Sequence, residues 1–103
     1  MLNLPRVNAK VGFTIDDLPP VPPIFRLIQI HGGVSSAEMY QVYNMGIGFC
    51  VLVSEKDRDV VLAILQSRGR RAKVIGRVID DDSKGVYLPQ QRLVGRGKEF
   101  HEQ

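Results

Sequence analysis

The sequence has one cysteine, no tryptophan and no apolar run long enough to cross a membrane. The single cysteine, Cys50, cannot form an internal disulfide, and its place inside an apolar run predicts a buried, unreactive thiol. That run, residues 49–53, has the length of a strand, whereas a membrane-spanning helix needs about 20 residues. No charged segment followed by an apolar stretch opens the chain, so no signal peptide is visible. These absences predict a cytoplasmic protein.

Basic residues outnumber acidic ones in the last third of the chain. Residues 1–67 hold five basic and six acidic side chains, whereas residues 68–103 hold nine basic and five acidic ones. A basic half can contact nucleic acid through phosphates. Here the acidic run of residues 80–82 interrupts the charge, and only Tyr87 and Phe100 offer rings for stacking. We therefore favour a solvated basic surface, and we expect neither a membrane nor a nucleic-acid partner.

Apolar periodicity in the first half predicts a strand followed by two helices. Residues 11–15 alternate like a short strand, and the proline-rich stretch after them excludes regular structure. A helix is predicted over residues 24–31, where Gly32 and Gly33 end it. A second helix is predicted over residues 35–44, because Ser35 can cap it.

The second half predicts a strand, a helix and two more strands. Residues 46–53 are continuously apolar, which is typical of a strand buried on both faces. A helix starting at Ser54 and strands over residues 72–79 and 86–88 follow. The fold class is α+β with α/β layering: a small mixed sheet with about three helices, in the order β-α-α-β-α-β-β. We expect a domain over residues 1–89 and a basic, flexible tail over residues 90–103, since the tail has little core material.

Motifs that carry chemistry are absent. Asp80, Asp81 and Asp82 could hold a hard cation, but a solvated turn is the interpretation we favour. The Gly-x-Gly of residues 46–48 leads into a strand, so it is neither a dinucleotide fingerprint nor a P-loop. No catalytic residue and no metal ligand is predicted from the residues alone.

Five segments, taken in order, resemble the C-terminal end of aminoimidazole ribonucleotide synthetase, also called phosphoribosylformylglycinamidine cyclo-ligase. Each segment alone is a weak signal, but the shared order and gaps make the resemblance specific. It covers about residues 2–88, including Val74–Val78, which resembles the family's closing strand. The five segments are Asn3–Val7, Val21–Gln29, Gly32–Ser35, Glu38–Tyr40 and Asn44–Gly48.

The resemblance implies a role in purine biosynthesis. The family's enzymes are homodimeric ligases that use ATP and Mg²⁺ to close an imidazole ring, and an N-terminal domain supplies most of the ATP site. The 103 residues resemble only the later part of the C-terminal domain. The resemblance therefore implies no cyclo-ligase activity and no cofactor for this chain alone. The implied partner is the absent N-terminal domain or a second copy of the chain.

Two candidate substrate-binding residues, Asn3 and Arg6, come from the resemblance, because they lie in its first motif. Arg6 suits a substrate phosphate, since a guanidinium can bind two oxygens. The alternative is a structural turn that anchors the domain. Whether the chain is part of an enzyme stays open, and a stand-alone, non-catalytic binding or oligomerisation module is the alternative function.

Overall fold

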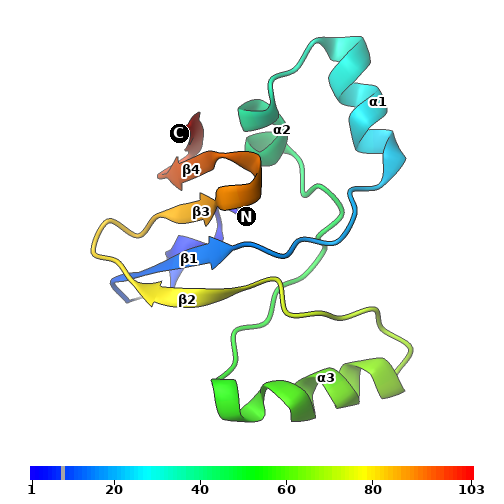
Figure 1. Cartoon of the computed structure of the whole chain (residues 1–103), viewed down its shortest axis with the longest axis vertical. Helices are drawn as coiled ribbons and strands as arrows, with labels where there is room; N and C mark the ends of the chain where they lie inside the picture. The colour runs from blue at the N-terminus through cyan, green and yellow to red at the C-terminus, as the bar shows by residue number, and fades with distance from the viewer. Residues whose placement is uncertain (8) are drawn as a thin grey trace.

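The computed structural model describes residues 1–7 and 9–103, which form a mixed five-stranded sheet and three α-helices (Figure 1). The helices are α1 (Pro23–Gly32), α2 (Ser36–Val42) and α3 (Arg58–Ser67). The strands are β1 (Val11–Ile15), β2 (Gly76–Asp80), β3 (Val86–Leu88), β4 (Leu93–Arg96) and β5 (Glu99–Glu102). Single 3₁₀ turns are η1 (Leu4–Arg6), η2 (Glu55–Asp57) and η3 (Pro89–Gln91). The predicted α+β class is confirmed.

The sheet has the order β2-β1-β3-β4-β5, with β1 and β3 parallel and every other pair antiparallel. Its register places Phe13 beside Val86, Val86 beside Gly95, and Gly95 beside Phe100. Directly paired residues point to the same face of a sheet, so this row forms one apolar face. The same row continues outward from Phe13 to Val78 on the edge strand β2.

The hydrophobic core lies between this face and α2. From α2, Met39 is fully buried and Tyr40 is nearly so. The backbone N–H of Phe100 donates to the Gln41 side-chain oxygen at 3.2 Å, which ties β5 to the helix. The nine buried hydrophobic residues are Phe13, Ile15, Met39, Tyr40, Met45, Val86, Leu88, Leu93 and Phe100.

Local signals set the end of α1 and the start of α2, as predicted, whereas α2 ends at Val42, before the predicted end at Asn44. Pro23 opens α1, and Gly33 follows it with a φ of 62°, the left-handed conformation that glycine adopts without strain. Ser35 caps α2, because its hydroxyl oxygen accepts a hydrogen bond from the Glu38 backbone N–H at 3.2 Å.

The predicted strand over residues 46–53 is wrong. Residues 46–53 pair with no strand among the described residues, and most of them are exposed, with Phe49 86% exposed. Cys50 is half-buried rather than buried. A continuously apolar strand needs a layer on each face, and in the described part of the chain this segment is not covered on both faces. The strand predicted over residues 72–79 begins later, at Gly76.

The C-terminal residues also differ from the expectation of a flexible tail. Strands β4 and β5 form a hairpin that joins the sheet beside β3. Its two inward side chains, Leu93 and Phe100, are 1% and 4% exposed. A half-buried hairpin needs only one apolar residue in two, so the sparse apolar residues of this segment are enough.

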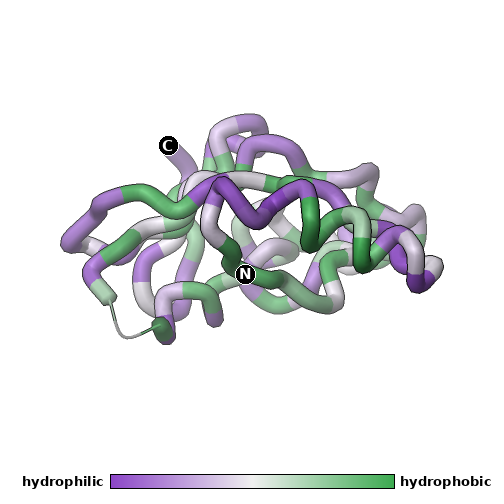
Figure 2. Tube along the Cα trace, turned by 90° about the horizontal axis from the view of Figure 1, so that it is seen from below, coloured by the Kyte–Doolittle hydropathy of each residue, from purple (hydrophilic) through white to green (hydrophobic). Residues whose placement is uncertain are grey.

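Helix α3 lies apart from the sheet, at the bottom of Figure 1. Among the described residues, none from α3 belongs to the core or packs against it. The molecule measures 41 × 35 × 20 Å, and the shortest dimension is seen in Figure 2. A thickness of 20 Å leaves room for few layers of helices and sheet. No helix in the described part of the chain is long and apolar enough to cross a membrane.

Large hydrophobic side chains are therefore exposed between residues 49 and 78. We call this set the open apolar surface. It comprises Phe49, Val51, Leu52, Val53, Val60, Ile64, Val74 and Val78.

Candidate functional site

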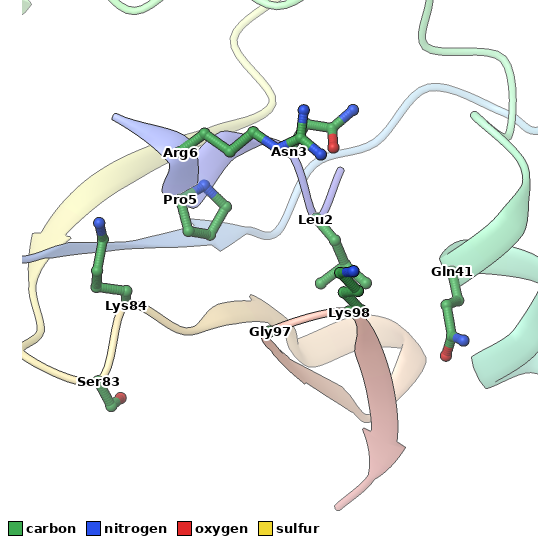
Figure 3. Close-up of a pocket in the computed structure, with 9 residues that line it drawn as sticks. All are labelled: Leu2, Asn3, Pro5, Arg6, Gln41, Ser83, Lys84, Gly97 and Lys98. Carbon is green, nitrogen blue, oxygen red and sulfur yellow. The ribbon is translucent and has the colours of Figure 1, made fainter. Parts of the chain in front are cut away.

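A depression of about 540 Å³ lies beside η1 (Figure 3). The turn forms because Pro5 fixes its own φ inside the first residues of η1. It places the side chains of Asn3 and Arg6, both exposed, along the same depression. The structure thus brings the two predicted site residues together, and their binding of substrate stays a prediction.

Three other segments complete the depression, and one of them is α2, which contributes Gln41. The loop between β2 and β3 contributes Ser83 and Lys84, and the turn between β4 and β5 contributes Gly97 and Lys98. The Lys84 ammonium donates to the Val7 carbonyl oxygen at 3.0 Å, which holds the loop against the end of η1. Sequence reasoning missed both lysines, because only the sheet topology brings these segments to η1.

Asp81 organises the loop that carries Lys84. One of its carboxylate oxygens accepts from the Ser83 hydroxyl at 2.6 Å and the Ser83 N–H at 3.0 Å. The other oxygen accepts from the Gly85 N–H at 3.1 Å and from the Tyr87 hydroxyl. These donors, the Ser83 hydroxyl first and then the Tyr87 hydroxyl, hold the pKa of the Asp81 carboxyl well below its usual range.

The lowered pKa of Asp81 predicts a loss of stability in acid. A carboxyl whose pKa is depressed by folding stabilises the protein above its unfolded pKa, and this contribution disappears as the pH falls toward the folded value. We expect Asp81→Asn to melt at a lower temperature than the wild type at pH 7. The difference should shrink from about pH 5 downward. Thermal unfolding followed by circular dichroism between pH 7 and pH 3 measures it, and a pH-independent difference would contradict this role.

A magnesium site does not fit the residues that the structure describes. No group of three or more His, Cys, Asp or Glu side chains among them could hold a metal ion. Both oxygens of Asp81 already accept hydrogen bonds within the loop. Asp81 and Asp82 lie in a turn closed by the hydrogen bond from the Lys84 N–H to the Asp81 carbonyl oxygen at 3.0 Å, whereas Asp80 is the last residue of β2.

Comparison with known proteins assigns the family. The family model described as "AIR synthase related protein, C-terminal domain" matches residues 3–89 of the chain. The chain belongs to this family. No solved structure gives a match.

Curated relatives of this AIR synthase family carry the name phosphoribosylformylglycinamidine cyclo-ligase. The protein from Methanocaldococcus jannaschii is 49% identical over 90% of this chain and 25% of its own length. The protein from Methanococcus vannielii is 44% identical over 88% of this chain and 26% of its own length. The protein from Bacillus licheniformis is 49% identical over 74% of this chain and 22% of its own length. The chain thus spans about a quarter of the length of the relatives it matches.

Proposed function

We propose that the chain acts as the C-terminal domain of a phosphoribosylformylglycinamidine cyclo-ligase, which closes an imidazole ring with ATP in purine biosynthesis. The family match over residues 3–89 carries the proposal. Because the chain corresponds to about a quarter of its relatives, the activity would require the other three quarters. The reaction would take place in the cytoplasm.

The chain's own contribution would be to bind substrate. Phosphoryl transfer depends on metal ions and on groups that position the phosphates. The described residues offer no metal cluster, so ATP and Mg²⁺ would be held by other parts of the enzyme. Asn3 and Arg6 would face the substrate from the depression beside η1.

The open apolar surface supports a partner. Large exposed apolar areas on soluble proteins mark interaction sites. Val78 continues the apolar row of the sheet onto β2 and is 47% exposed, and Val60 on α3 is 61% exposed. We propose that the rest of the enzyme covers this surface. Self-association of the chain is the alternative way to cover it.

A stand-alone, non-catalytic module is the alternative function. The observation that favours it is a core of nine buried hydrophobic side chains, as a domain that folds on its own requires. Such a module would bind or oligomerise without any role in catalysis.

Complementation distinguishes the two functions. The partner protein is the Methanocaldococcus jannaschii enzyme from which the segment matching this chain has been deleted. We expect the 103-residue chain alone to produce no aminoimidazole ribonucleotide from ATP and formylglycinamidine ribonucleotide, and the mixture to produce it. A mixture that stays inactive, while the intact relative is active under the same conditions, would favour the stand-alone module.

A further inference from the structure

The depression beside η1 is lined by three positively charged side chains and by no acidic side chain. Arg6 comes from η1, Lys84 from the loop between β2 and β3, and Lys98 from the turn between β4 and β5 (Figure 3). The other lining residues are neutral: Leu2, Asn3, Pro5, Gln41, Ser83 and Gly97. Three cations around one depression, with no carboxylate among its lining residues, favour an anionic ligand.

Three acidic residues lie next to this depression in the chain, and none of them lines it; the exposed Asp82 precedes Ser83, and the other two are Asp81 and Glu99. Asp81 accepts its hydrogen bonds within its own loop, from Ser83 and Gly85 among others. The Glu99 carboxylate lies 3.7 Å from the His101 imidazole nitrogen. Neither carboxylate lines the depression, so its positive charge is not neutralised from these two neighbours.

The hairpin turn fixes the position of Lys98. Arg96 pairs with Glu99, so Gly97 and Lys98 form a two-residue turn. Gly97 has a φ of 64°, whereas Lys98 is not among the residues with positive φ, which is the pattern of a type II′ turn. Lys98 therefore lies at the tip of a hydrogen-bonded hairpin and not on the flexible tail that the sequence predicted. Lys84 is also fixed, since its ammonium uses one of three donors on the Val7 carbonyl oxygen.

We propose that the C-terminal hairpin supplies Lys98 to a phosphate-binding site that Arg6 and Lys84 complete. The guanidinium of Arg6 can bind two phosphate oxygens at once, and each lysine adds a compact charge. Lys98 lies beyond residue 89, where the family match ends. The phosphate of a ribonucleotide substrate is the expected source, and only this last point rests on the proposed function.

Titration of the ¹⁵N-labelled chain tests the site. Inorganic phosphate and ribose 5-phosphate are added separately at constant ionic strength, and amide shifts are followed. We expect saturable shifts concentrated at residues 2–6, 83–85 and 97–98. Lys98→Gln should weaken binding about two- to fivefold, the range of an exposed ion pair, and Arg6→Gln about tenfold, because a bidentate contact is lost. Lys56→Gln removes the same charge on η2, away from the depression, and should change nothing.

The outcomes separate this inference from the proposed function. Shifts spread over the whole chain, or equal weakening by Lys98→Gln and Lys56→Gln, would overturn the site. Tighter binding of ribose 5-phosphate than of inorganic phosphate supports a phosphate ester as the ligand, and equal binding would overturn that assignment. Phosphate binding without complementation would count against the cyclo-ligase role alone.

Discussion

Replacement of Gly76 by valine is expected to lower the free energy of unfolding strongly. Gly76 is the first residue of β2 and pairs with Ile15 in β1. A Cβ atom at this position would lie 2.0 Å from the Thr14 carbonyl oxygen and 2.8 Å from the Ile15 Cα. Both are backbone atoms of a strand paired on each side, so neither can move without breaking the sheet. We expect a loss of about 3 kcal/mol or more.

That loss is large for a domain of this size, because a chain of about 100 residues is stable by only about 5–15 kcal/mol. Urea unfolding followed by circular dichroism measures it. Gly48→Val is the matched control, since nothing lies within 4 Å of a Cβ at Gly48 and its φ is not positive. The control should change the free energy of unfolding by less than about 0.5 kcal/mol. Equal stability of the two variants would show that β1 and β2 do not pair in this register.

Elements with local signals were predictable from the sequence. The Ser35 cap, the Gly33 terminator and the alternating strand β1 each depend on residues a few positions apart. Capping and periodicity act within one turn or one strand, so the sequence alone contains the information.

The apolar segment of residues 46–53 was mispredicted for a physical reason. Its apolar composition indicates that the segment favours burial. The composition does not indicate whether a neighbouring strand or helix is available to bury it. Strand β2 is the edge of the sheet, with β1 as its one partner among the described residues. An apolar segment without a partner stays exposed. The sequence predicted that residues 46–53 are buried, but the described residues include no element that covers them.

The candidate site was half predictable. Asn3 and Arg6 lie in one short motif, so a resemblance over a few residues identified them. Lys84 and Lys98 reach the same depression only because β1 pairs with β3 in parallel and because residues 93–102 form a hairpin. A signal for that hairpin was present, since Gly97-Lys98 is a typical two-residue turn between short alternating segments.

The open apolar surface leads to the second large effect. We expect the double substitution Val60→Glu and Ile64→Glu to reduce binding to the rest of the enzyme by more than about a hundredfold. Full burial of one such side chain contributes about 1.5–3 kcal/mol, and the two are already partly buried, so lost contact accounts for about 2–3 kcal/mol. Desolvation of two unpaired carboxylates in the interface adds to this, so the total exceeds the roughly 2.7 kcal/mol that corresponds to a hundredfold. The two side chains are 61% and 55% exposed, so the stability of the chain itself should change little.

A control on the same helix separates lost apolar contact from added charge. Gln66→Glu also places a carboxylate on α3 but removes no large apolar side chain, and Gln66 is exposed. Isothermal titration against the deleted Methanocaldococcus jannaschii enzyme should detect the loss for the double variant and near-normal binding for Gln66→Glu. Sedimentation of each variant alone tests self-association. The double substitution can instead dissociate a self-associated form and leave binding to the enzyme unchanged. In that case a second copy of the chain covers this surface, because only an interaction that buries Val60 and Ile64 responds to their replacement.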